Sequence, residues 1–259
     1  MLRILLLTMS LLLSSNCADE KNTPVASTIS EPVKELIANP LDSCQQLVLV
    51  LSPNDTNVIA KLRRYEKRAG QWKLLGEAHD VSLGRTGLAW GTGKHSLTEI
   101  QGNRKKEGDG KSPAGIFSFG VAFGYAAEMP NLKMPYVPIT ERIQCIEDSE
   151  SKYYNRIVDN TQLTKDWQTA DFMQRKDDLY EFGVFVNHNV TAQKEGGSCI
   201  FLHLWRGFGK PTAGCTAMEK ENMLRLLQWL DPVQKPRLVQ LVARDYPKFA
   251  EQYDLPKMD

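Results

Sequence analysis

Short apolar runs separated by polar turns recur along most of the chain, which is a pattern typical of β-structure. The continuous apolar run Leu-Val-Leu-Val-Leu at 47–51 predicts a buried strand. Residues 57–66 and 72–77 flank an Arg-Ala-Gly-Gln turn and predict a hairpin. Further strands are predicted at 180–188, 198–205 and 237–242. We therefore expect a mainly β fold with a few helices.

The predicted strand at 198–205 has two different faces. Side chains alternate along a strand, so one face carries Cys199, Phe201, His203 and Trp205, and the other carries Ile200, Leu202 and Leu204. The pattern then changes to a helical spacing of leucines over 217–231, where Pro232 ends the helix. We expect glycine-rich loops over 84–115, and long loops with a short helix near 169–176 over 121–180.

The first 18 residues have the layout of a secretory signal peptide. A basic start is followed by an apolar run of about ten residues, which is shorter than the roughly twenty that a membrane span needs. We therefore expect export to the periplasm or cell envelope. Cys17 stands where a bacterial lipoprotein signal places its lipidated cysteine, and ordinary cleavage near Ala18 is the alternative. A lipid on Cys17 would attach the protein to the inner or outer membrane.

A polar segment with three prolines follows at 19–43 and reads as a linker, which leaves 44–259 as a single domain. Hydrophobic residues make up 42% and charged residues 24% of the chain, and the net charge is +1. A nucleic-acid-binding protein would usually show a basic excess, so no nucleic-acid partner is expected. No sequence motif calls for a cofactor.

Beyond Cys17 the chain has four cysteines: Cys44, Cys145, Cys199 and Cys215. An exported protein can oxidise cysteines in pairs, and we expect a Cys44–Cys145 disulfide, although one sequence does not fix the pairing. A Cys199–Cys215 disulfide is an alternative. A metal site drawing on His188, Cys199, His203 and Cys215 is a rival interpretation, but none of the known ligand spacings is present, so no metal is predicted.

Cys215 is the candidate nucleophile. Thr216-x-x-Glu219 has the form of a capping box, which predicts Thr216 as the N-cap and Cys215 one residue outside a helix N-terminus. A thiol at such a place is expected to ionise more readily. Gly214 leaves the backbone free to turn and a substrate free to approach. His203 lies on the strand whose following loop returns to Cys215, so it is the candidate base.

His203, a glycine-containing loop and then Thr212-Ala213-Gly214-Cys215 resemble the L,D-transpeptidase catalytic domain (YkuD-type). That family's pattern is a His, a variable loop, then Ser/Thr-His-Gly-Cys. Three other segments are similar to one exported subgroup, at 84–87, 106–117 and 201–206, as is the stretch from 153 to 189. The family's second histidine is Ala213 here, and the basic residue after the cysteine is missing. Thr-Ala-Gly-Cys is thus a variant of the motif.

The resemblance implies a β-sandwich or barrel with long insert loops, acting on peptidoglycan stem peptides. It implies that Cys215 forms a thioester with a tetrapeptide and passes it to an amine, with His203 as base. Arg206, His188 and Thr212 are the candidate substrate-binding residues, while Asp109 and Lys111 are expected to be turn residues. An L,D-carboxypeptidase that uses water, and a non-catalytic envelope lipoprotein that binds peptidoglycan, are the alternatives.

Overall fold

The computed structural model describes residues 39–98 and 100–258. The predicted signal peptide at 1–18, the predicted lipidation of Cys17 and most of the predicted 19–43 linker lie outside the described residues.

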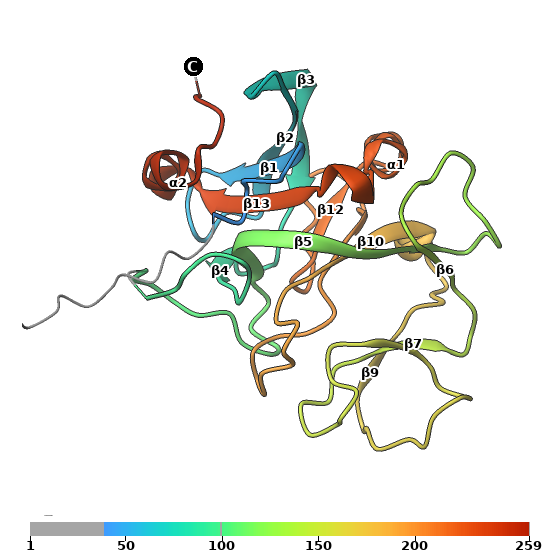
Figure 1. Cartoon of the computed structure of the whole chain (residues 1–259). Coiled ribbons are helices and arrows are strands. Elements are labelled where there is room, and N and C mark those ends of the chain that lie inside the picture. The colour runs from blue at the N-terminus through green and yellow to red at the C-terminus, as the bar shows by residue number, and fades with distance from the viewer. Residues whose placement is uncertain (1–38, 99, 259) are drawn as a thin grey trace, which may run out of the picture. The chain divides into compact units, whose positions relative to one another are not determined.

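A ten-stranded sheet forms the core of the structure (Figure 1). Its strands are β1 (Gln46–Ser52), β2 (Ile59–Arg68), β3 (Gln71–Ser82), β4 (Leu88–Trp90), β5 (Ser112–Gly124), β6 (Tyr136–Pro138), β10 (Phe182–Val186), β11 (Phe201–Leu204), β12 (Thr216–Met218) and β13 (Arg237–Val242). The strand order is β10-β11-β12-β3-β2-β1-β13-β5-β4, and β6 also pairs with β5. The predicted strands at the beginning and end of the domain are confirmed.

The sheet closes on itself through β5. This strand pairs antiparallel with β13 on one side, where Ile116 faces Val239, and antiparallel with β10 on the other, where Ala122 faces Val184. Because β10 also pairs with β11, the strands from β10 round to β5 form a closed ring. Closure removes the open edges that a flat sheet would expose. The expectation of a mainly β, barrel-like fold is confirmed.

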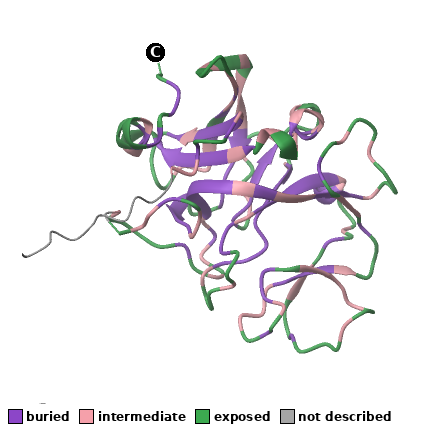
Figure 2. Cartoon of the chain, in the orientation of Figure 1, coloured by how far each residue is buried: buried purple, intermediate pink, exposed green. Residues whose placement is uncertain are grey.

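Local sequence features explain the β2–β3 hairpin and the burial of β1. The predicted hairpin is β2–β3, whose Ala69 and Gly70 have φ values of 48° and 76°, the left-handed values that a tight two-residue turn requires. Strand β1 pairs in parallel with β13 and is buried along most of its length, which accounts for its continuous apolar run. Figure 2 shows that β1, β13 and much of β5 are buried.

Two helices cover the sheet, α1 (Lys220–Trp229) and α2 (Tyr246–Tyr253). Helix α1 buries Met223, Leu226 and Leu227, and α2 buries three aromatic side chains. The predicted helix over 217–231 is therefore present but begins later, because Thr216–Met218 forms strand β12. None of the described helices is long and apolar enough to span a membrane.

The two predicted faces of β11 are confirmed by the packing. Ile200, Leu202 and Leu204 belong to the large core of the barrel. Cys199 and Phe201 belong instead to a smaller apolar cluster, which also contains Cys215. The second cluster thus brings the candidate nucleophile beside the odd-numbered face of the strand.

A separate three-stranded sheet, in the order β8-β7-β9, occupies the segment for which long loops were predicted. Its strands are β7 (Ile143–Ile146), β8 (Ile157–Asp159) and β9 (Ala170–Phe172), and a 3₁₀ turn, η1 (Asp178–Tyr180), precedes β10; η2 (Pro232–Gln234) and η3 (Ala243–Asp245) flank β13. The predicted short helix near 169–176 is wrong, because Asp171 and its neighbours pair with β7.

The predicted Cys44–Cys145 disulfide is also wrong. Cys145, on β7, is bonded to Cys199, just before β11, so the disulfide joins the small sheet to the barrel. Cys44 lies in the large core just before β1, where its thiol donates to the Gln46 carbonyl at 3.1 Å. A Cys199–Cys215 disulfide is excluded as well, since Cys215 is a free thiol.

Candidate functional site

Cys215 lies at the end of the 206–215 connection, immediately before strand β12. Thr216 is not a helix N-cap, because α1 begins four residues later, after Glu219. The expected placement of Cys215 at a helix N-terminus is therefore wrong. The Thr-x-x-Glu pattern spans a three-residue strand that pairs in parallel with β11, where Leu202 faces Thr216 and His203 faces Ala217.

The sulfur of Cys215 is held by main-chain groups at the start of β11. The N–H of Phe201 donates to Sγ at 3.3 Å, and the thiol donates to the carbonyl of Cys199 at 3.5 Å. Cys199 has a φ of 55°, a left-handed value that is uncommon for a side-chain-bearing residue. Its N–H donates to Oδ1 of Asn155 at 2.9 Å, and its side chain is in the disulfide. The neighbourhood of the sulfur is thus fixed by several bonds.

The backbone on the other side of the nucleophile is fixed by two hydroxyl groups. Thr212 Oγ1 and Ser112 Oγ both donate to the carbonyl oxygen of Cys215, at 2.6 Å and 2.9 Å. Thr212 Oγ1 also accepts from the N–H of Gly214 at 3.1 Å. Thr212 therefore holds the turn that presents Cys215.

His203 extends from β11 and is 5% exposed. Its Nδ1 lies 2.7 Å from the carbonyl oxygen of Leu204. Because a carbonyl only accepts, Nδ1 carries the proton in this contact, and Nε2 is left as the basic nitrogen. The ring of Tyr180 packs edge-on against the imidazole, with centroids 5.1 Å apart.

Cys215 and His203 line the same small pocket, which has a volume of about 100 Å³. Its walls come from η1 and Arg175 before it, from β11 and β12, and from the connection that leads to Cys215. The lining residues are Arg175, Leu179, Tyr180, His203, Leu204, Trp205, Arg206, Lys210, Pro211, Thr212, Ala213, Cys215 and Ala217.

Cationic side chains surround this pocket. Arg175 lies over the Tyr180 ring and forms a 2.7 Å ion pair with Asp177. Arg206 is 56% exposed and reaches Asp177 only at 4.0 Å, so it is weakly paired. Lys210 also lines the pocket. The mouth of the pocket is suited to an anionic group such as a carboxylate.

Burial keeps both candidate reactive groups neutral. It raises the pKa of the Cys215 thiol to about 12; the Phe201 N–H opposes this, and the nearby carboxylates of Asp171 and Glu147 add to it. Burial also lowers the pKa of His203 to about 4, although its bond to Leu204 acts in the opposite direction. The expectation that the thiol ionises readily is thus wrong for the unliganded protein, because the helix N-terminus behind that expectation is absent.

The structure brings together four of the predicted site residues in one pocket: Cys215, His203, Arg206 and Thr212. Gly214 lies beside them in the buried turn. His188 does not reach the pocket lining; it is 1% exposed, its Nε2 contacts the carbonyl of Gly196 at 3.0 Å, and its ring packs edge-on against Phe117.

The rival metal site fails on its ligands, since Cys199 is in a disulfide. Within residues 39–98 and 100–258, no group of three or more His, Cys, Asp or Glu side chains could hold a metal ion. Asp109 and Lys111 occupy a tight turn, as expected, in which Asp109 accepts from the N–H groups of Lys106 and Lys111.

Sequence reasoning missed Tyr180, Arg175 and Lys210, which all line the pocket. Arg175 falls in the short helix that was wrongly predicted near 169–176, and Tyr180 was taken as the start of the strand at 180–188, although it ends the 3₁₀ turn η1. Lys210 could have been found, because it lies in the short connection between His203 and Cys215 together with Arg206.

Comparisons with known proteins extend this picture. The family model of the L,D-transpeptidase catalytic domain, YkuD, matches residues 58–239. No curated protein matches significantly. Two similar solved structures are the helical cell shape determining protein Pgp2 from Campylobacter jejuni, at 17% identity and a TM-score of 0.37, and its K307A mutant, at 16% and 0.36.

Each structural match covers 76% of this chain and 47% of the other, so the chain spans about half the length of these proteins. Similarity at this level supports no statement about activity. The family model, by contrast, covers most of the barrel and includes both His203 and Cys215. The chain belongs to the L,D-transpeptidase catalytic domain family, YkuD.

Proposed function

We propose that this protein is a peptidoglycan L,D-transpeptidase in which Cys215 forms a thioester with a stem tetrapeptide and transfers it to an amine. The family is one of cysteine-dependent L,D-transpeptidases and carboxypeptidases, which supports peptidoglycan as the substrate. The observation that carries the proposal is the shared pocket of Cys215 and His203, in which the Nδ1 bond to Leu204 leaves Nε2 as a base.

The proposed reaction has two steps. In the first, Nε2 of His203 takes the thiol proton, and Sγ forms a bond to the carbonyl carbon of the L-centre that precedes the terminal D-alanine. The C–N bond breaks, and the departing D-alanine amine receives that proton. In the second step His203 takes a proton from the acceptor amine, whose nitrogen forms a bond to the thioester carbon. The C–S bond breaks, and the proton passes to the sulfur, which restores the thiol.

Main-chain N–H groups near the turn are proposed to stabilise the oxyanion. The N–H of Gly214 is already bonded to Thr212 Oγ1, so it can serve only if that hydroxyl turns away. We propose that Arg206, together with Lys210, binds a substrate carboxylate at the mouth of the pocket. For Thr212 we propose a supporting role, because its hydroxyl is occupied by the turn.

The test is incubation of the purified protein with muropeptides, followed by mass spectrometry. Joined stem peptides are the expected product. Loss of D-alanine alone would show carboxypeptidase action, with water as acceptor, and would contradict the amine acceptor. Unchanged muropeptides that still bind would identify a non-catalytic binding protein.

The matched variants are Cys215→Ala and Cys44→Ala. Both remove a buried thiol, but only Cys215 lines the pocket. We expect Cys215→Ala to abolish turnover while Cys44→Ala keeps it. Full activity in Cys215→Ala would refute the proposed nucleophile.

We also propose that the protein is exported and held in the cell envelope, as the sequence of residues 1–18 indicates. Intact mass spectrometry of the mature protein from a membrane fraction distinguishes a lipidated Cys17 from ordinary cleavage near Ala18. A mature chain that still begins at Met1 would contradict export.

A further inference from the structure

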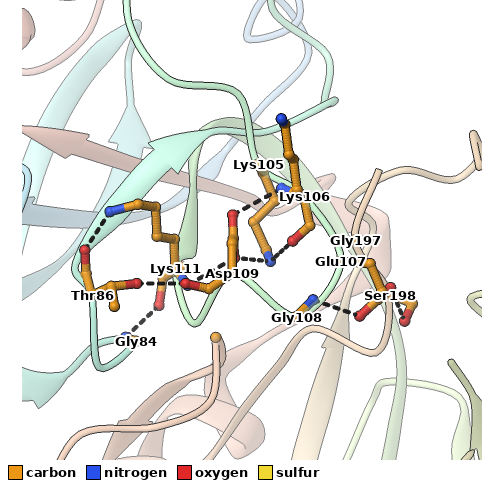
Figure 3. Close-up of polar contacts among 12 residues, drawn as sticks. Gly84, Thr86, Lys105, Lys106, Glu107, Gly108, Asp109, Lys111, Gly197 and Ser198 are labelled. Atoms are coloured by element: carbon orange, nitrogen blue, oxygen red, sulfur yellow. Dashed lines mark hydrogen bonds and ion pairs between the residues drawn. The ribbon is translucent and has the colours of Figure 1, made fainter. Parts of the chain in front are cut away.

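The glycine-rich segment from Lys105 to Lys111 lies directly behind the turn that carries Cys215. Figure 3 shows Lys105 and Asp109 pointing toward each other within this segment. Nζ of Lys105 donates to Asp109 Oδ1 at 2.6 Å and to the carbonyl of Lys106 at 2.7 Å. The main-chain N–H of Lys105 donates to Trp90 at 2.8 Å, which ties the segment to β4.

The Lys105 ammonium is buried next to Gly214. Only 4% of its side chain is exposed, which is rare for a lysine. A Cβ atom at Gly214 would lie 3.9 Å from Nζ and 3.1 Å from the carbonyl oxygen of Lys111, and a Cβ at Gly197 would lie 3.1 Å from the Lys105 stem. Gly197 thus leaves room for the Lys105 stem, and Nζ lies within ordinary contact distance of the Gly214 position in the nucleophile turn.

The middle of the segment is fixed to the chain that supports the sulfur. Glu107 Oε2 accepts from Ser198 Oγ at 2.7 Å and from the hydroxyl of Tyr154, as its contact with Ser198 in Figure 3 illustrates. Ser198 directly precedes Cys199, whose carbonyl accepts from the Cys215 thiol. The ammonium is therefore held at a constant position relative to Cys215.

The surroundings of the sulfur explain why a buried cation matters there. Burial opposes ionisation of Cys215, and so do the charges of Asp171 on β9 and Glu147 after β7. Tyr180 from η1 and neutral His203 from β11 also face this pocket, as do the cationic side chains of Arg175, Arg206 and Lys210. The Phe201 N–H and the Lys105 charge act in the opposite direction and lower the pKa of the thiol.

We propose that the buried ammonium of Lys105 favours the thiolate of Cys215 from behind the Gly214 turn, and that Lys105 is thus a positioning residue for the reaction. The inference rests on the proposed function, since it takes Cys215 as the nucleophile. Asp109 holds the ammonium in place. Its carboxylate is 17% exposed and shared with the N–H groups of Lys106 and Lys111, so it offsets the buried positive charge only in part.

The test follows alkylation of Cys215 by iodoacetamide across pH, with the modified peptide measured by mass spectrometry. Lys105→Met removes the charge and keeps much of the stem. We expect its Cys215 titration to shift upward and its alkylation rate at pH 8 to fall by about tenfold. Lys111→Met is the matched control, because Lys111 is on the same segment but donates outward to the Thr86 carbonyl.

A second variant, Asp109→Asn, should shift the titration of Cys215 in the opposite direction. It removes the counter-charge and keeps Lys105, so we expect the titration of Cys215 to shift downward. An unchanged profile in Lys105→Met, or a shift of both variants in one direction, would overturn the proposal, because a merely structural ion pair predicts either result. If Lys105→Met does not fold, Asp109→Asn decides alone: a downward shift supports the proposal, and any other result overturns it.

The alkylation assay contains no peptidoglycan, so its outcome is independent of the turnover test. If the enzyme is active but the alkylation profile of Lys105→Met matches that of the wild type, only the proposed role of Lys105 is refuted. A lack of turnover together with the expected shifts would remove only the proposed reaction.

Discussion

The N–H of Phe201 donates to the sulfur of Cys215 at 3.3 Å, across the parallel pairing of β11 with the start of β12. Because β11 also carries His203 two residues further on, a single strand positions both the sulfur and the candidate base. The neutral resting state of the pair follows from burial of both side chains. In the proposed reaction the thiol proton must therefore pass to His203 during catalysis.

Replacing His203 by Gln should lower kcat by about 100-fold or more, because the variant keeps a hydrogen-bonding side chain but loses the base. Steady-state turnover of muropeptides provides the measurement. The matched control is His79→Gln on β3, since His79 does not line the pocket. Equal losses in both variants would show that His203 matters only for folding.

Arg206→Ala should raise KM by about tenfold with little change in kcat, if Arg206 binds a substrate carboxylate in the ground state and the transition state alike. Arg225→Ala is the control, because Arg225 is comparably exposed but lies on α1, where it pairs with Glu221 and does not line the pocket. A fall in kcat at constant KM would instead give Arg206 a role in the chemical step.

Loss of the Cys145–Cys199 disulfide should destabilise the protein by about 4 kcal/mol, given the 54-residue separation and the loop-entropy relation. Urea unfolding of the Cys145→Ser/Cys199→Ser double variant measures this. We also expect lower turnover, because Cys199 supplies the carbonyl that contacts the Cys215 thiol. An unchanged unfolding midpoint would show that the bond does not constrain the chain.

Stability should fall as pH drops from 7 to 5. Burial lowers the pKa of His95, His188 and His203 to about 4, whereas the unfolded chain takes up these protons near pH 6.5. The unfolded state therefore binds more protons between pH 6.5 and 4, and these three histidines together lower the free energy of unfolding by about 5 kcal/mol between pH 7 and pH 5.

Glu147 acts with the opposite sign. Burial, followed by the charges of Asp171 and Glu107, raises its pKa to about 7. Its protonation therefore stabilises the folded state increasingly as pH falls from 7 toward 4.5. One carboxyl group does not outweigh three histidines. Urea unfolding at pH 7 and pH 5 gives the net change, and greater stability at pH 5 would contradict the prediction.

The sequence predicted those parts of the fold that depend on local pattern. The apolar run of β1, the alternation of β11 and the leucine spacing of α1 each reflect one buried face, so periodicity was enough. The turn Ala69-Gly70 was likewise visible from residue type. Cys215 and His203 were found because a short connection joins them.

The features that were predicted wrongly or missed depend on contacts between segments that are distant in the sequence. Thr216-x-x-Glu219 matches a capping box in sequence, but in the structure Thr216 pairs with β11 and forms a strand. The local motif alone does not show that β11 lies beside it. The partner of Cys145 is fixed by the position of β7 beside Cys199, which no spacing reveals. The burial of Lys105 likewise depends on a distant segment, because Gly197 leaves room for its stem.

Strand β13 lies between β1 and β5 in the barrel, although its residues 237–242 come near the end of the sequence. A chain that is still being synthesised therefore presents two unpaired strand edges, on β1 and β5, until β13 is complete. Such non-local pairing makes for slow folding and for a period of vulnerability to aggregation. Ending the chain before residue 237 would thus remove β13 and open the barrel between β1 and β5, even though every residue that lines the pocket would still be present.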